Sequence, residues 1–319
     1  MINNLKITII NLYNNPWPAW FKYFLLSCET NKSFNWLIIS ENERPNLVPG
    51  NVRFIKISYK DLSHRIKEQL GIEPAIVHPF KFSDYKPAYG LIFKDYLKES
   101  TFWGYCDIDL VFGDLSNFIT DEVVIKYDII SPSADFFPGH FLLLKNTDRI
   151  NNLFKLALNW KEILGNPDCY CFDEKVTLPP LKPDSTSIYM ALKSNVRRHL
   201  REYYFIRNPF FHLLNKSLGG IRKKRKIRLD EIKDFNSAIN YSRLHGNIKT
   251  LNQQWFNDDI IMLRDRKKSF RIDWKEGKLF DGQNEILYFH FPLSKYSRSF
   301  RINEIDHSHF ALINEHIEV

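Results

Sequence analysis

The sequence contains one short acidic motif, Asp107-Ile108-Asp109, whose residue types and spacing could hold a divalent cation. Two carboxylates separated by one residue can face the same ion where the chain turns at the end of a strand. A cation held there neutralises the charge that develops when a diphosphate leaves. An acidic pair in a loop can equally be a solvated or capping pair. Here an aromatic strand precedes the motif and an apolar turn with Gly113 follows it, which favours metal binding.

The elements that must position this motif alternate between strands and helices along the first half of the chain. The apolar patterns predict strands at 6–10, 35–40, 52–57, 101–106, 127–131 and 140–145, and helices at 17–28, 60–70, 87–99 and 147–163. This alternation favours an α/β fold with a mostly parallel, doubly wound, Rossmann-like sheet. Ligands of such sheets bind beyond the carboxyl ends of the strands, so we expect the acidic motif and Tyr13, which follows the first strand, at that edge.

The N-terminal sequence, the hydropathy and the cysteines indicate in which cellular compartment we expect the protein. The N-terminus runs into an apolar strand without the pattern of a signal peptide, and no window has the roughly 18 uninterrupted apolar residues of a membrane span, so we expect a cytoplasmic protein. Four cysteines fit a reducing compartment, and Cys169-x-Cys171 lacks the second pair or His cluster of a zinc site.

The net charge of +8 is concentrated in one stretch. Residues 193–228 hold twelve Lys and Arg against Glu202 alone, a net +11, so the rest of the chain carries −3. We expect the surrounding 190–235 to be a basic, aromatic-rich helical insertion. It would dock peripherally on the anionic inner face of the cytoplasmic membrane, or form a solvated face of the protein.

Three segments of the sequence resemble a bacterial family of lipopolysaccharide and capsule glycosyltransferases, and more distantly glycogenin-like enzymes. They are residues 82–90, 102–114 and 139–146, with a short C-terminal motif at 287–291. The resemblance implies a single GT-A catalytic domain over 1–319 with added C-terminal helices. It also implies sugar transfer from a nucleotide-sugar, UDP-sugar favoured, to a glycan or lipid-linked glycan acceptor, with Mn²⁺ or Mg²⁺ as cofactor.

The resemblance also assigns roles to individual residues. Matched by motif, His290 is a third metal ligand beside Asp107 and Asp109, or else a histidine packed at a strand end. Lys86, with Asp84 two residues earlier, could place an ammonium on the donor phosphates next to a helix start at Pro87, and Lys295 is a second phosphate candidate.

A second acidic pair, Asp173-Glu174, resembles the segment that lies under the reacting sugar in this type of fold. It would supply a general base in an inverting enzyme, or orient the sugar in a retaining one. The alternative is an acidic loop pair. Asp135 and His140 are lesser candidates, since both are expected near the same edge.

Two other functions fit parts of the sequence. A nucleotidyltransferase or phosphotransferase would use the same acidic motif, although no Gly-x-x-x-x-Gly-Lys phosphate loop is present. A nucleic-acid-binding protein would use the stretch 193–228, but the acidic remainder of the chain disfavours it, so no nucleic-acid partner is expected.

Overall fold

The structure is a computed structural model that describes residues 5–174, 228–259, 262, 269–306 and 308–314. A seven-stranded sheet at its centre has the order β3-β2-β1-β4-β7-β6-β8. Its strands are β1 Ile7–Leu12, β2 Phe34–Ser40, β3 Val52–Lys56, β4 Phe102–Cys106, β6 Ile129–Ser131, β7 Phe141–Lys145 and β8 Thr250–Asn252. Only the pairings of β7 with β4 and β6 are antiparallel. The predicted class, an α/β protein with a mostly parallel sheet, is confirmed.

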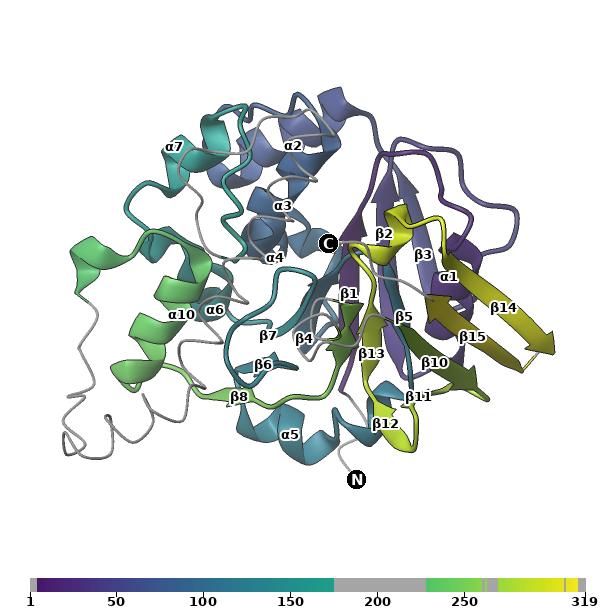
Figure 1. Cartoon of the computed structure of the whole chain (residues 1–319). Helices are drawn as coiled ribbons and strands as arrows, with labels where there is room; N and C mark the ends of the chain where they lie inside the picture. The colour runs from purple at the N-terminus through teal and green to yellow at the C-terminus, as the bar shows by residue number, and fades with distance from the viewer. Residues whose placement is uncertain (1–4, 175–227, 260–261, 263–268, 307, 315–319) are drawn as a thin grey trace.

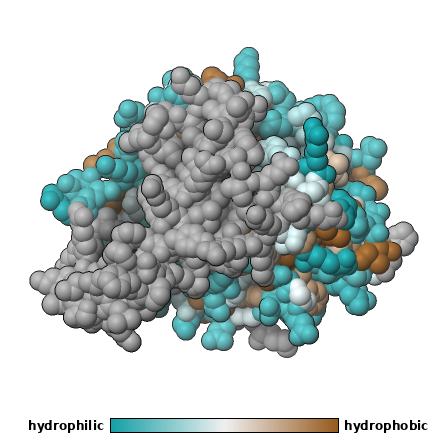
Figure 2. All heavy atoms as spheres, viewed as in Figure 1, coloured by the Kyte–Doolittle hydropathy of each residue, from teal (hydrophilic) through white to brown (hydrophobic). Residues whose placement is uncertain are grey.

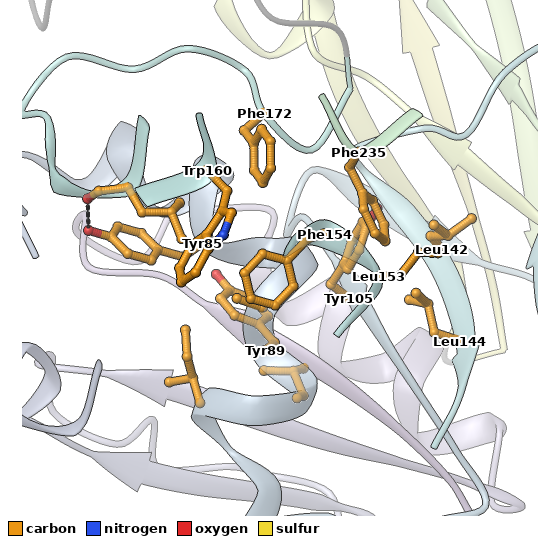
Figure 3. Packing of buried hydrophobic residues seen from close by; sticks show 14 of the residues in the cluster. Tyr85, Tyr89, Tyr105, Leu142, Leu144, Leu153, Phe154, Trp160, Phe172 and Phe235 are labelled. Atoms are coloured by element: carbon orange, nitrogen blue, oxygen red, sulfur yellow. Dashed lines mark hydrogen bonds between the residues drawn. The ribbon is translucent and has the colours of Figure 1, made fainter. Parts of the chain in front are cut away.

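Helices cover one face of the central sheet (Figure 1). They are α2 Tyr59–Leu70, α3 Phe82–Tyr85, α4 Tyr89–Ile92, α6 Asp148–Asn151, α7 Trp160–Gly165 and α10 Phe235–Leu244. Local signals explain their ends: Ser58 accepts the N–H of Asp61 at the start of α2, and Gly71 ends this helix with φ +66°. Aromatic side chains fill the space between these helices and the sheet, as Figure 3 shows for Tyr85, Tyr105 and Phe154.

The other face of the sheet packs on α1 Phe21–Thr30 and on a small three-stranded sheet, and a second small sheet packs on these two. One has the order β5-β13-β9, with β5 Leu110–Phe112, β9 Asn257–Asp258 and β13 Tyr288–His290. The other is antiparallel and has the order β12-β11-β10-β15-β14. Its strands are β10 Phe270–Lys275, β11 Lys278–Asp281, β12 Asn284–Ile286, β14 Phe300–Asp306 and β15 His309–Asn314. Buried apolar residues from both smaller sheets and α1 form a third cluster.

Two predicted helices need correction, and a third predicted element lies mostly outside the described residues. The expected helix at 87–99 consists of short pieces, because the backbone leaves the helical region at Phe93 (φ −114°, ψ 25°) and again at Leu97 (φ −104°, ψ 6°). The expected helix at 147–163 is likewise divided into α6, a 3-10 turn Leu153–Leu156 and α7. The predicted basic insertion at 190–235 lies mostly outside the described residues.

The surface visible in Figure 2 is mainly hydrophilic where described residues form it, with small hydrophobic patches. Within the described ranges, no helix combines the length and the apolar character that crossing a membrane requires.

Candidate metal and nucleotide site

The acidic motif lies where the central sheet meets the three-stranded sheet. Strand β4 ends at Cys106, whose carbonyl accepts a hydrogen bond of 2.7 Å from the Asn11 side chain at the end of β1. The chain then turns through Asp107 and Asp109 into β5, which pairs antiparallel with β13 so that Leu110 lies opposite His290. The N–H of Phe291 donates to the Asp109 carbonyl at 3.1 Å. Backbone pairing therefore places His290 beside Asp109.

Asp107, Asp109 and His290 form one group of possible metal ligands. Their ligand atoms all lie within 4.8 Å of one another, and His290 Nε2 is 3.7 Å from Asp109 Oδ1. The Asp109 and His290 side chains are each 8% exposed, whereas the Asp107 side chain is 37% exposed. Asp107 thus provides the open side of the group.

Burial and charge set protonation states that suit ligation. Burial lowers the pKa of His290 to about 4 against the effect of the aspartates, so its imidazole is neutral at neutral pH. Burial alone would raise the pKa of Asp109, but Lys295 and His290 outweigh it and set that pKa to about 2. The buried Nδ1 of His290 has no hydrogen-bond partner among the described residues. Two carboxylates and one neutral imidazole with a spare nitrogen fit a divalent ion such as Mn²⁺.

Two lysines contact the two aspartates from opposite directions. Lys86 Nζ lies 2.8 Å from Asp107 Oδ1, and Lys295 Nζ lies 2.6 Å from Asp109 Oδ2. Burial would lower the pKa of each lysine, but the facing carboxylates raise it above the usual value, so both are charged. The site therefore combines two cationic and two anionic side chains within a few ångströms.

His140, the first residue before β7, packs directly on the histidine of this group. The two imidazole rings are stacked with centroids 4.0 Å apart, and His140 Nε2 is 2.9 Å from the Tyr288 hydroxyl. The His140 carbonyl also accepts the N–H of Asp107 at 3.0 Å. His140 is therefore in contact with both strands that carry the possible ligands and fixes the plane of the His290 ring.

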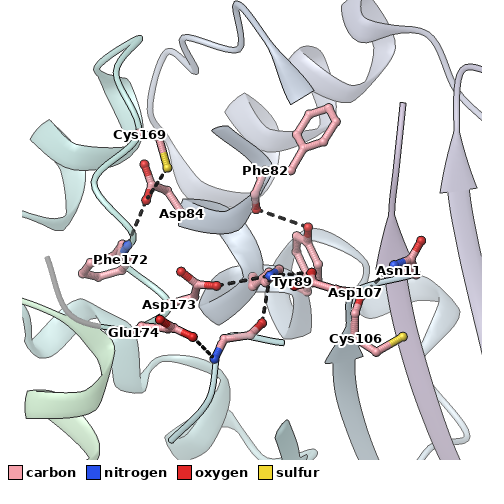
Figure 4. Close-up of polar contacts among 12 residues, drawn as sticks. Asn11, Phe82, Asp84, Tyr89, Cys106, Asp107, Cys169, Phe172, Asp173 and Glu174 are labelled. Atoms are coloured by element: carbon pink, nitrogen blue, oxygen red, sulfur yellow. Dashed lines mark hydrogen bonds and ion pairs between the residues drawn. The ribbon is translucent and has the colours of Figure 1, made fainter. Parts of the chain in front are cut away.

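The second acidic pair reaches the same site through Lys86, which contacts both Asp173 and Asp107. Figure 4 shows Asp173 and Glu174 near Asp107. Asp173 Oδ2 is 3.2 Å from Lys86 Nζ, and Glu174 Oε1 accepts the Gly139 N–H at 2.9 Å. Burial raises the pKa of Asp173 to about 7 despite the opposing effect of Lys86. A carboxyl group with such a pKa can exchange a proton near neutral pH.

The remaining predicted residues are placed differently. Tyr13 is half-buried and stacks on Trp17, and the charges of Lys295 and Asp109 act on its hydroxyl. Asp84 is fully buried, with its carboxylate directed at backbone N–H groups and at Lys81 instead of the acidic motif. Asp135 is exposed.

Comparisons with known proteins give a family and several structural likenesses, among them a galactosyltransferase. The sequence profile of a family of unknown function, DUF6625, matches residues 9–319. The chain belongs to this family. No curated protein matches it.

A galactosyltransferase, LgtC, solved in complex with donor and acceptor sugar analogs, is similar to this DUF6625 chain at 15% sequence identity, with a TM-score of 0.30. The alignment covers 49% of this chain and 64% of the galactosyltransferase, less than two thirds of its length.

Three residues that support the site in this DUF6625 chain had no assigned role in the sequence analysis. Gly139 touches the second acidic pair so closely that a Cβ would lie 2.3 Å from Asp173 Oδ2. Asn236, in α10, bonds the Phe137 backbone twice and the Glu174 carbonyl once, each at 2.9 Å. Asp259 is buried after β9 and accepts the N–H groups of Leu293 and Ser294, just before Lys295.

Proposed function

We propose that the chain is a metal-dependent glycosyltransferase of the GT-A type. It moves a sugar from a nucleotide-sugar donor, a UDP-sugar first of all, to a glycan or lipid-linked glycan acceptor. The observation that carries the proposal is the group Asp107, Asp109 and His290 flanked by the charged Lys86 and Lys295. Carboxylates with an imidazole hold a divalent cation, and paired ammonium groups beside them match the charge of a diphosphate.

The parts of the donor then correspond to parts of the site. Tyr13, which follows β1 and is only half-buried, offers a ring for the base. Lys86 and Lys295 would contact the phosphates and stabilise charge on the departing nucleoside diphosphate. The cation would supply further neutralisation of that diphosphate. Asp107, as the most exposed of the three ligands, faces the side from which the donor enters.

Asp173 and Glu174 would act on the sugar side of the site. Asp173 has a pKa near 7, so it can accept a proton from an acceptor hydroxyl close to neutral pH. Glu174 is exposed and its carboxylate is tied to the Gly139 N–H, which fits an orienting role. The arrangement is compatible with inversion or retention.

The test is a screen of UDP-, GDP- and CMP-sugars with Mn²⁺, read out as release of free nucleotide and as sugar transferred. We expect metal-dependent release of a nucleoside diphosphate, lowered at least about a hundredfold in Asp109→Asn because a metal ligand is lost. Asp121→Asn, which alters an exposed acid in α5 Asp121–Lys126 away from the site, should retain wild-type release.

The identity of the product separates this proposal from its rival. A nucleotidyltransferase or phosphotransferase using the same aspartates would release pyrophosphate or transfer phosphate, and sugar would stay on the nucleotide. Normal turnover by Asp109→Asn with metal present would refute the role given to the acidic motif.

A further inference from the structure

A fully buried ion pair, Lys81 with Asp84, contacts the segment that leads into the second acidic pair, Asp173 and Glu174. Lys81 and Asp84 have no exposed side-chain surface, and Lys81 Nζ is 2.7 Å from Asp84 Oδ2. Lys81 Nζ also donates to the carbonyls of Ile163 at 2.6 Å and Asp168 at 2.8 Å. All three protons of the ammonium therefore have acceptors. The lysine joins α3 to the end of α7 and the loop after it.

The carboxylate of Asp84 binds the backbone of the segment that follows. It accepts the N–H groups of Tyr170 at 3.0 Å and Phe172 at 2.8 Å, and the Cys169 thiol at 3.8 Å (Figure 4). Cys171 lies between the two bonded amides with φ +54°, a left-handed conformation that non-glycine residues seldom adopt. Such a turn directs neighbouring N–H groups toward one anion. The Asp84 carboxylate is thus an internal anion that stabilises a strained turn.

The residues directly after this turn are the second acidic pair. The Glu174 N–H donates to the Cys171 carbonyl at 3.0 Å, so the conformation of Cys171 sets the direction of the chain at Glu174. Asp173 then meets Lys86, and Glu174 meets the Gly139 N–H. The contact with Gly139 is so close that little displacement of the segment is tolerated.

We propose that Lys81 and Asp84 are positioning residues: as a buried anchor, they hold the Cys169–Glu174 segment so that Asp173 and Glu174 lie in register with Lys86 and Gly139. The catalytic part of this inference rests on the proposed sugar transfer, whereas the anchoring itself does not. Asp107, Asp109 and His290 are held by the strand ends of β4, β5 and β13, which the anchor does not contact. The anchor therefore acts on the reacting sugar through Asp173 and Glu174, and reaches the possible metal ligands only through Lys86, which contacts both Asp173 and Asp107.

The anchor can be removed without leaving a buried charge by the double variant Lys81→Met with Asp84→Leu. Replacing only one partner would leave the other charge buried and unpaired, which by itself destabilises a protein. The matched control is Leu62→Ala, a core truncation in α2 of a fully buried residue, which lowers stability without touching the segment.

Three measurements separate positioning from stability. Amide hydrogen exchange of peptides covering 168–174 should rise at least about tenfold in the double variant, with β4 and β13 protected as in wild type. Manganese-dependent UDP binding should change less than about twofold. The kcat for sugar transfer should fall at least about tenfold with little change in donor KM, because the carboxylates move relative to the sugar. Leu62→Ala should leave all three near wild type, apart from a uniform rise in exchange.

Wild-type exchange of 168–174 in the double variant would overturn the anchor. A parallel loss of exchange protection, UDP binding and turnover, as in a globally weakened protein, would overturn it too. A wild-type protein that transfers no sugar from any donor would refute the proposed function, and the exchange measurement would still decide whether the anchor exists.

Discussion

At the scale of single residues, the site contains ionisable groups whose protonation is set by burial as much as by their partners. His290 is neutral because burial disfavours its charged form, while Asp109 stays charged because Lys295 and His290 outweigh its burial. Asp259, one strand away, has its pKa raised to about 7 by burial even though it accepts two backbone N–H groups. These differences lead to separate predictions for His290 and Asp259.

Replacing His290 by Ala should weaken manganese-dependent UDP binding at least about tenfold, because a ligand is removed from a set of three. His140→Ala is the matched control: the two rings stack on each other and are similarly buried, but His140 is not in the ligand group. Titration calorimetry with Mn²⁺ and UDP gives the affinity, and thermal unfolding without ligand gives the stability. Equal losses of affinity in both variants would mark His290 as a packing residue.

Asp259→Asn should change how the free energy of unfolding depends on pH. The pKa of this carboxyl group is about 7 in the folded protein and near 3.9 in the unfolded protein. The group therefore lowers the free energy of unfolding progressively as the pH rises from about 4 to 7. The stability of the variant relative to wild type should therefore rise by about 1.4 kcal/mol per pH unit over that window. His290 and His140, whose pKa values are lowered by burial, make the free energy of unfolding change with pH in the opposite direction. Both histidines are present in wild type and in the variant, so their contributions cancel in the difference between the two proteins.

Urea unfolding of the ligand-free protein between pH 4.5 and 6.5 measures this difference. Leu62→Ala, which changes no ionisable group, should give a flat line. A flat line for Asp259→Asn as well would show that Asp259 ionises normally in the folded protein.

At the scale of elements, the site depends on the ends of strands and on the turns between them. The start of β7 is the most crowded point, because Gly139 donates to Glu174, its carbonyl accepts from Lys86, and Asp173 lies against its Cα. A side chain at this position has no room. The backbone there approaches both the lysine and the second acidic pair.

Gly139→Ala should displace the Asp173 side chain, since the new Cβ would lie 2.3 Å from its Oδ2. We expect a loss of about 1–3 kcal/mol in the free energy of unfolding, as for other insertions into packed regions. The kcat should fall on the order of tenfold, because the carboxylates shift relative to the sugar. Gly50→Ala is the control, as its Cβ would meet nothing within 4 Å. Normal turnover by Gly139→Ala would contradict the role given to Asp173.

The apolar pattern was sufficient to predict six strands of the central sheet and α2, since period and capping residues agree there, but it did not predict β8. The pattern also missed the breaks within 87–99 and 147–163, segments that make contacts such as that of Gly90 with Trp103. Those contacts join residues far apart in sequence, which a local pattern does not record. The pairing of β5 with β13 was not predicted, and only the place of His290 beside the two aspartates followed from the resemblance at 287–291.

The same limit applies to residues of the site. Nothing near Asp84 in the sequence indicates that its carboxylate turns toward Tyr170 and Phe172, away from the acidic motif. Asn236 and Asp259 likewise have partners from distant segments. Buried polar residues that bind backbone groups of another segment leave no sequence signal of their own.

At the scale of the whole molecule, the charge is divided between an acidic remainder and the basic stretch 193–228. Most of this stretch lies outside the described residues, so its role stays a prediction from sequence. We expect it to bind anionic membranes, where a lipid-linked acceptor would be found. Each Lys or Arg near such a surface contributes about 1 kcal/mol, so binding should fall as salt rises.

Liposome co-sedimentation with and without anionic lipid tests this expectation. Binding should weaken when Lys223, Lys224, Arg225 and Lys226 become Gln. A control with the same change in net charge replaces four exposed lysines elsewhere, at Lys60, Lys67, Lys94 and Lys98, and should still bind. A wild-type protein that ignores anionic liposomes at low salt would point to an acidic glycan as the partner of the basic stretch.

The antiparallel pairing of β5 with β13 has a consequence for the order in which the chain folds. Strands β1 to β4 and β7 are complete early during synthesis, and both aspartates are already in place by then. The strand that brings His290 emerges from the ribosome much later, and closing so long a loop is slow and entropically costly. A nascent chain that has not reached Tyr288 therefore holds two of the three possible metal ligands. An ion bound by residues on both sides of the β5–β13 pairing would stabilise the folded protein by mass action. The ion would then contribute to folding stability as well as to the reaction.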